Sequence, residues 1–436
     1  MKPIFLFSAL ISYISVHAVE YKSYSTVLKN GMKVIVCEKP DVHFTEFEVW
    51  YKTGSKDEVP GIRGMAHMFE HMMFRGTKKF PGNSIFDNVD KYGGSCNAYT
   101  DYDRTVYHEY VPEDALETVF DMESDRMANL VISQEILDTE RQVVGEEFRN
   151  GVNNWYQKLD LERSKLLYPT GHPYEVSVIG YLEEITQFTS KQCQDFYDKY
   201  YSPNNAYLVI VGNVKSQAMF DLAEKYFGKV TKQLDLKVRT DVPDIISNKL
   251  KAPELNLDYP IPVQVFSYIL PQPSAGSTEY YAFHMFKNLL FVGENSILQS
   301  RLVKKDHQAY AIQLASEDES MYSNYCIMDI IMQAFPGNAR VKKVIREEID
   351  RIATDGVSQD LMNQFITSTE ATEMMNSYSP ETIAQQLGIA EYYLHDYNKA
   401  YSEVDELKKI TVADLKNVAT KYFSTERIQV LNVKPM

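Results

Sequence analysis

Apolar residues form two kinds of pattern along the first half of the chain. Short apolar or alternating runs bounded by turn residues predict β-strands at 33–39 (KVIVCEK), 46–54 (EFEVWYKTG), 105–111 (TVYHEYV) and 205–214 (NAYLVIVGNV). Apolar residues at helical spacing predict α-helices at 61–74, 113–130, 133–149 and 190–201. Because strands and helices mix without a strict β–α–β alternation, the pattern predicts layered α+β structure.

The same pattern occurs twice in the chain. Residues 189–215 and 411–435 both contain a Thr-led amphipathic helix, then Lys-Tyr-aromatic-Ser, then an apolar strand ending in Asn-Val-Lys. The stretch HMFEHMMF (67–74) likewise has a counterpart in HMFKNLLF (284–291), where Glu70 has become Lys287 and His71 has become Asn288. This duplication predicts two homologous α+β domains, of which only the first keeps the three polar residues.

The length of the chain is consistent with this division. A chain of 436 residues is too long for one comfortable hydrophobic core. Residues 230–262 mix charges with prolines and show no sustained period, as is typical of a linker. We expect an N-terminal domain over 19–235, a linker over 236–255 and a C-terminal domain over 256–436.

The first residues, MKPIFLFSALISYISVHA, have the features of a secretory signal peptide. Lys2 precedes an apolar segment, and Val16 and Ala18 are the small residues that signal peptidases accept, so we expect cleavage after Ala18. The alternative is a buried N-terminal strand, and a mitochondrial presequence fits less well because the segment has no arginine. The signal predicts an exported protein, either periplasmic or secreted by a bacterium.

Composition excludes several classes of protein. A hydrophobic content of 44% with 24% charged residues is ordinary for a globular protein, and no apolar run reaches the roughly 18 residues of a membrane span. The net charge of −15 disfavours nucleic acid as a partner and suits solubility or cationic substrates. The four cysteines are far apart without CxxC spacing, which argues against a zinc ribbon or a dense disulfide framework.

The stretch MAHMFEHMMF (65–74) contains the candidate chemistry. On a helix, His67 and His71 lie one turn apart on the same face, and Glu70 borders that face. Two imidazoles at this spacing can bind one zinc ion, which in a catalytic site takes a third protein ligand and leaves a position for water. Glu70 would be the general base that deprotonates that water.

A helix whose polar residues simply face solvent is the alternative interpretation. The neighbouring Met, Ala and Phe residues argue against it, because buried polar groups cost several kcal/mol unless they are paired or bind a metal. The third ligand is expected on the helix at 133–149, N-capped by Ser133. Glu140 and Glu147 are two turns apart on one face, whereas Glu146 points elsewhere, and spacing alone leaves either of the pair as the ligand.

These segments resemble the zinc peptidase family of pitrilysin, insulysin and the mitochondrial processing peptidase, whose motif is H-x-x-E-H. The resemblance covers about residues 31–215 and extends more weakly to the C-terminus. It rests on HMFEHMMFRGTKKFP, GGSCNAYTDYDRTVYHEYVPEDALE, ESDRMANLVIS, ERQVVGEE, GHPYEVSVIGYLEEI and YYSPNNAYLVIVGNV, which stand in family order. The length resembles the short branch, which includes bacterial proteins that pair as dimers, so the resemblance implies half of a clamshell with one Zn²⁺ in the first domain.

The resemblance also implies roles for individual residues. His67, His71 and Glu147 match the zinc ligands, Glu70 matches the catalytic base, and Glu140 matches the glutamate that orients a ligand histidine. Asn97, Ala98 and Tyr99 match the edge strand to which an extended substrate adds by main-chain hydrogen bonds. Without the resemblance, that segment reads equally well as an ordinary turn and strand start.

One position departs from the family pattern. NSILQSRLVKKDHQAYAI resembles the stretch in which an arginine and a tyrosine, seven residues apart, reach the substrate and the oxyanion. Tyr310 fits the tyrosine, but Val303 stands where the arginine is expected, between Arg301 and Lys304. The alternative interpretation of Tyr310 is an aromatic side chain that only packs within a strand. The departure predicts either a homodimer that manages without this arginine or a heterodimer whose homologous partner supplies the Arg and Tyr.

Taken together, the sequence predicts an exported zinc endopeptidase that hydrolyses peptides or unfolded polypeptides. The main alternative is an inert structural or assembly subunit of the same fold, as in the core proteins of the respiratory bc complex. A metal-binding oxidoreductase with two histidines and one carboxylate is a third hypothesis.

Overall fold

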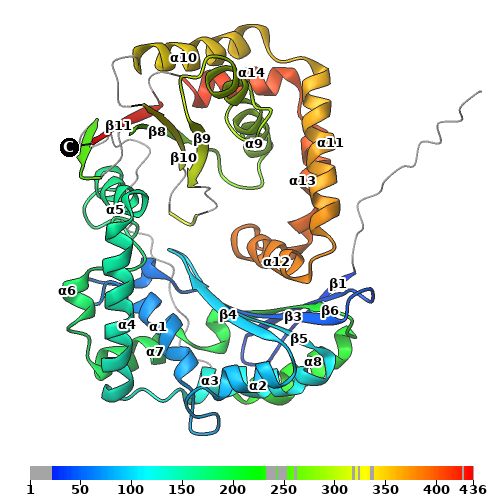
Figure 1. Cartoon of the computed structure of the whole chain (residues 1–436). Coiled ribbons are helices and arrows are strands. Elements are labelled where there is room, and N and C mark those ends of the chain that lie inside the picture. The colour runs from blue at the N-terminus through cyan, green and yellow to red at the C-terminus, as the bar shows by residue number, and fades with distance from the viewer. Residues whose placement is uncertain are drawn as a thin grey trace, which may run out of the picture.

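The computed structural model describes residues 22–231, 242, 253–259, 263–316, 320–322, 325–333, 338–424 and 427–435. The predicted signal peptide and most of the predicted linker lie outside these residues, so both stay predictions. Two α+β domains, each a sheet covered by helices, make up the described chain (Figure 1). Among the described residues, no helix is both long and apolar enough to cross a membrane.

The first domain is built on a six-stranded sheet in which only β2 and β6 are parallel. Its order is β1 (Ser23–Val27), β2 (Lys33–Glu38), β6 (Ala206–Gly212), β3 (Phe44–Tyr51), β5 (Thr105–Pro112) and β4 (Ser95–Thr100). Four of these strands correspond to the predicted ones. Strand β4 lies at one edge, so its outer backbone groups have no neighbouring strand within the described chain.

Helices cover one face of this sheet and form the first core with it. They are α1 (Met65–Met72), α2 (Ser84–Lys91), α3 (Leu116–Asn129), α4 (Gln134–Asn153), α6 (Leu182–Ile185), α7 (Ser190–Tyr200) and α8 (Ser216–Tyr226). The helix predicted at 61–74 begins only at Met65, because the preceding Gly64 has a left-handed backbone with φ of 95° that ends helical geometry there.

The second domain repeats this plan with a five-stranded sheet. Its order is β7 (Glu254–Leu257), β11 (Gln429–Pro435), β8 (Val263–Pro271), β10 (Tyr325–Gln333) and β9 (Ala311–Ser316). Its helices are α9 (Thr278–Leu290), α10 (Asn338–Asp355), α11 (Gln359–Asn376), α13 (Glu403–Leu407) and α14 (Val412–Tyr422), with a π-helix η6 (Gln299–Lys305) and a 3₁₀ segment η7 (Tyr397–Tyr401). The duplication is visible in detail, because Thr189 and Thr411 each cap their helix through a reciprocal capping box.

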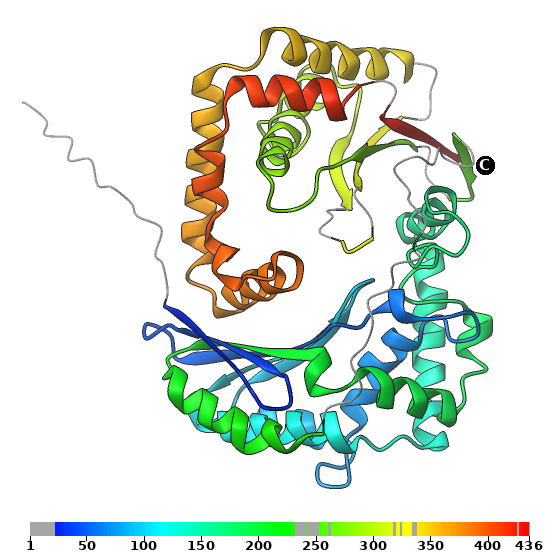
Figure 2. The same cartoon turned by 180° about the vertical axis from the view of Figure 1, so that it is seen from behind.

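Each domain sends one helix onto the other domain's sheet (Figures 1 and 2). Helix α12 (Pro380–Leu394) packs on the open face of the first sheet, where Ile383, Ala384 and Leu387 contact Trp50 and neighbouring apolar residues. Helix α5 (Trp155–Leu167) packs in return on the second sheet, in a cluster that contains Leu159 and Ile269. This exchange ties the domains together, and neither apolar periodicity nor the repeat had predicted it.

Candidate metal centre

Helix α1 carries both predicted histidines on one face. Its eight residues run behind the edge strand β4, and all of its apolar side chains are buried. The ring centroids of His67 and His71 are 5.0 Å apart, and the rings are nearly perpendicular. The spacing of one helical turn therefore places the two imidazoles side by side, as expected from the sequence.

The N-terminus of α1 is held by a buried carboxylate that sequence reasoning missed. The backbone N–H groups of Gly64 and Ala66 each donate to one oxygen of Glu58 at 2.8 Å. These donors would otherwise be unsatisfied at the helix start. Burial raises the pKa of Glu58 to about 8, although the two N–H donors act to lower it. Glu58 lies too far before the helix to resemble an N-cap residue in the sequence.

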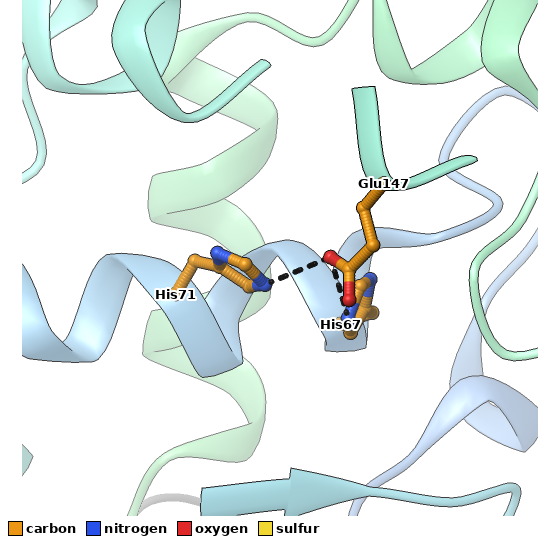
Figure 3. A group of neighbouring side chains, drawn as sticks. All are labelled: His67, His71 and Glu147. Carbon is orange, nitrogen blue, oxygen red and sulfur yellow. Dashed lines mark ion pairs between the residues drawn. The ribbon is translucent and has the colours of Figure 1, made fainter. Parts of the chain in front are cut away.

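The third member of the cluster comes from α4, which begins after Ser133 as predicted. Oε2 of Glu147 lies 3.7 Å from Nε2 of His67 and 3.4 Å from Nε2 of His71 (Figure 3). One ligand atom from each of these residues falls within a group no wider than 4.8 Å. The neighbouring Glu146 instead pairs with Arg149 at the surface.

Glu140 lies beneath His71 on the side away from Glu147. Its Oε2 is 3.6 Å from Nδ1 of His71, and Nε of Arg75 donates to its Oε1 at 2.6 Å. Glu140 is fully buried, and burial raises its pKa, but the His71 and Arg75 partners outweigh burial and lower it overall. Arg75 lies four residues after His71, so helical spacing could have identified it.

The two histidines differ in their electrostatic environment. Burial lowers the pKa of His67 and outweighs the nearby carboxylates. Burial also lowers the pKa of His71, but the carboxylates of Glu140 and Glu147 reverse this effect and raise it to about 9. In the metal-free protein, His71 therefore carries a proton at neutral pH that a metal ion must displace.

The geometry of the cluster fits a zinc ion. Two imidazole nitrogens and one carboxylate oxygen are a ligand set of catalytic zinc sites. Tetrahedral ligands about 2.0–2.1 Å from an ion lie about 3.4 Å from one another. The nitrogen-to-oxygen distances of 3.4 and 3.7 Å between Glu147 and the histidines are near this spacing, and the three ligand atoms lie within 4.8 Å of one another.

A pocket of about 390 Å³ opens beside the cluster. Its lining includes His67, Glu147 and the predicted base Glu70, together with Tyr99 and Thr100 of β4. The side chain of Glu147 is 51% exposed, so the cluster is accessible from solvent. Candidate metal ligands, the carboxylate of Glu70 and the edge strand β4 therefore border the same pocket.

Successive side chains of the predicted substrate strand β4 point to opposite faces of the sheet. Ala98 is buried in the first core, whereas Asn97 is exposed and Tyr99 lines the pocket. The hydroxyl of Tyr99 donates to Oε1 of Gln385 on α12 at 2.8 Å. Strand β4 therefore connects the candidate metal centre with the helix contributed by the second domain.

Tyr310 lies apart from this pocket within the described chain. It precedes β9, its side chain is 56% exposed, and it does not line the pocket beside Glu70. Val303 packs against the second core from η6. Arg301 is ion-paired with Glu347 and Glu348, and Lys304 with Glu294. Both cations beside Val303 thus have carboxylate partners within the second domain.

Comparisons with known proteins agree with this fold and identify zinc proteases among the relatives. Residues 33–170 match the family model described as "Insulinase (Peptidase family M16)", and residues 187–368 match "Peptidase M16 inactive domain". The zinc protease PqqE of Helicobacter pylori is 28% identical over 97% of this chain and 95% of its own length. A crystal structure of a protease from Helicobacter pylori is similar with a TM-score of 0.83 and 26% identity, covering 95% of this chain and 100% of that one. The structure of the periplasmic protease PqqL from Escherichia coli is similar with a TM-score of 0.78 and 20% identity, covering 96% of this chain and 48% of that one.

Proposed function

Since this chain belongs to peptidase family M16, we propose that it is a zinc-dependent endopeptidase acting on peptides or unfolded polypeptides. One observation carries the proposal: His67, His71 and Glu147 are spaced as ligands of a single ion, beside a pocket that Glu70 and the edge strand β4 share. A zinc ion bound there would supply a Lewis acid that acidifies water and polarises a peptide carbonyl.

The residues of this chain have distinct tasks in the proposed reaction. Glu70 takes the proton of the attacking water and delivers it to the leaving amine, so one carboxylate is first base and then acid. The outer edge of β4 aligns the substrate backbone through main-chain hydrogen bonds. Glu140, held by Arg75, orients the imidazole of His71 as a positioning residue.

Zinc content and peptide cleavage, measured on purified variants, test this proposal. Glu70→Gln should retain zinc and lose cleavage by a factor of about 10²–10⁴, because the general base is removed but no ligand is. Glu147→Gln should weaken zinc binding, whereas the adjacent Glu146→Gln should behave as wild type. A wild-type protein without metal affinity, or a Glu70→Gln variant as active as wild type, would contradict the proposal.

An inert structural or assembly subunit is the second candidate. The observation in its favour is Val303, because the two cations beside it are engaged with Glu347, Glu348 and Glu294. This candidate predicts that the purified protein binds no zinc under conditions in which other zinc peptidases are loaded.

We further propose that the chain works with a homologous subunit, as a homodimer or a heterodimer. A partner with an arginine and a tyrosine seven residues apart would complement Val303. Native mass measurement of the isolated complex tests this, and an active monomer would refute it.

Export is also proposed, on the basis of residues 1–18 and of a similar protein named as periplasmic. N-terminal sequencing of the mature protein tests it, since export predicts a chain that begins at Val19.

A further inference from the structure

The second domain retains a pocket at the place that corresponds to the metal site. Helix α9, the counterpart of α1, lines a cavity of about 530 Å³ together with α12 and residues 399–403. In the first domain, the pocket beside the metal cluster is lined by α1, by α4 and α5, and by residues 177–179. The repeat that aligns Thr189 with Thr411 also aligns 177–179 with 399–401. The two pockets are therefore related by the duplication.

The chemistry of the second pocket has changed from metal binding to positive charge. Nδ1 of His284 lies 2.8 Å from Oε1 of Glu403. Lys287, which replaces the predicted base, lines the same pocket and is 3% exposed. Asn288, which replaces the second histidine, donates its Nδ2 hydrogen to the carbonyl of His284 within α9. The ligand set of the first domain is thus absent at these described positions.

The first domain contributes a cation to this pocket. Arg104, in the turn after β4, packs its guanidinium over the rings of Trp50, Tyr392 and Tyr393. It pairs with Asp101 at 3.1 Å and donates to the hydroxyl of Tyr393, while its Nε is buried with no hydrogen-bond partner among the described residues. The lining contains three cationic side chains, those of Arg104, Lys287 and Lys399. Glu403 is the one carboxylate among the described lining residues. The three cations therefore outnumber the carboxylates even when Asp101, the partner of Arg104, is included.

The two pockets meet near the turn of the β4–β5 hairpin, where the backbone N–H of Asp101 donates to the carbonyl of Arg104 across the turn. Tyr99 and Thr100 line the pocket at the metal cluster, and Arg104 lines the second pocket four residues later. Tyr99 also bonds to Gln385, whose neighbour Gln386 lines the second pocket. A peptide paired with β4 advances about 3.3 Å per residue along this direction. A peptide that continues past Thr100 would therefore leave the strand beside the turn that carries Arg104, at the cationic pocket.

We propose that the second pocket binds a carboxylate of the peptide substrate, either its C-terminus or an acidic side chain, through Lys287, Lys399 and Arg104. This rests on the proposed peptidase function and makes the second domain a substrate-anchoring unit. The interaction is with a part of the substrate remote from the scissile bond, so it can be measured as equilibrium binding in a variant that does not cleave.

Equilibrium binding separates this proposal from catalysis. The zinc-loaded Glu70→Gln protein is titrated with a labelled peptide of about ten residues that has a blocked N-terminus and otherwise uncharged side chains. The peptide is made with a free C-terminal carboxylate, with a C-terminal amide, or as the amide with one penultimate glutamate. The carboxylate-bearing forms should bind about tenfold more tightly than the plain amide, as expected for hydrogen bonds to a charged group. The first and third forms distinguish the two sources of the carboxylate.

Variants identify the pocket. Lys287→Met and Lys399→Met, each added to Glu70→Gln, should remove most of this preference, whereas Lys304→Met, at an ion pair outside the pocket, should preserve it. Lys399 is exposed, so its variant remains informative if Lys287→Met fails to fold. Equal binding of all three peptides, or a preference that survives in Lys399→Met, overturns the proposal. If the wild-type protein does not cleave peptides but the preference for carboxylate-bearing peptides is present, only the proposed peptidase function is refuted.

Discussion

At the scale of single residues, the candidate centre depends on where each carboxylate sits relative to the two imidazoles. Glu147 reaches the solvent-facing side of both, and Glu140 lies behind His71. Spacing left either glutamate as the ligand, and the family resemblance favoured Glu147. The structure places Glu147, and not Glu140, within reach of both Nε2 atoms. Glu140 and Glu147 lie two turns apart on α4, and α1 is itself only about two turns long, so the two carboxylates reach different sides of the histidine pair.

The raised pKa of His71 predicts a pH dependence of zinc binding. Below about pH 9 the metal-free protein holds a proton on His71 that zinc must displace, so the apparent zinc affinity should fall about tenfold per pH unit as pH decreases. Calorimetry in buffers of different ionisation enthalpy would count about one proton released per zinc at neutral pH. Proton release of zero at pH 7.5 would contradict the raised pKa. The Glu140→Gln variant should show less release, since one of the carboxylates that raise the pKa is lost.

At the scale of elements, α1 depends on how the chain enters it. Gly64 has a φ of 95°, and a Cβ at this position would lie 2.6 Å from the carbonyl oxygen of Ile179. Glu58 then caps the first N–H groups of the helix. Both residues lie before the histidine motif in the chain, and together they set the direction of the helix that carries it.

Gly64→Ala should consequently destabilise the protein and weaken zinc binding. The matched control is Gly61→Ala, because Gly61 has a φ of 96° but no atom of the described residues would lie within 4 Å of a Cβ added there. The control should cost only the left-handed backbone, about 1–2 kcal/mol, whereas Gly64→Ala adds a backbone clash and should cost more. Denaturant unfolding and zinc titration measure both effects. Equal losses of stability in the two variants would show that the close contact between Gly64 and the carbonyl of Ile179 is unimportant.

At the scale of the whole molecule, the exchanged helices join two domains that the repeat alone would leave separate. Arg163 of α5 bonds to Asp329 of β10 at 3.0 Å, and the hydroxyl of Tyr207 donates to the carbonyl of Gly388 in α12. These buried polar contacts accompany apolar packing on both sheets. We infer that the two domains unfold together in the described arrangement.

Gly388→Ala tests this cooperativity. A Cβ at Gly388 would lie 2.1 Å from an atom of the Trp50 ring, so α12 must move away from the first sheet. We expect a loss of about 1–3 kcal/mol and a broadened or split unfolding transition in calorimetry, where wild type shows one. The control is Gly145→Ala in α4, whose nearest neighbour would be 3.7 Å away and whose helix propensity improves. A single unchanged transition in Gly388→Ala would refute the role of this contact.

Features that follow from local chain geometry can be predicted from the sequence. Helical spacing places His67 and His71 on one face, capping residues start α4 and α7, and the repeat reports two related domains. Contacts between groups from distant segments become visible only in the folded chain. The exchange of α5 and α12 and the cationic pocket on α9 arise from long-range packing. Such contacts leave no periodic signal, because the intervening chain sets no fixed distance between the residues that form them.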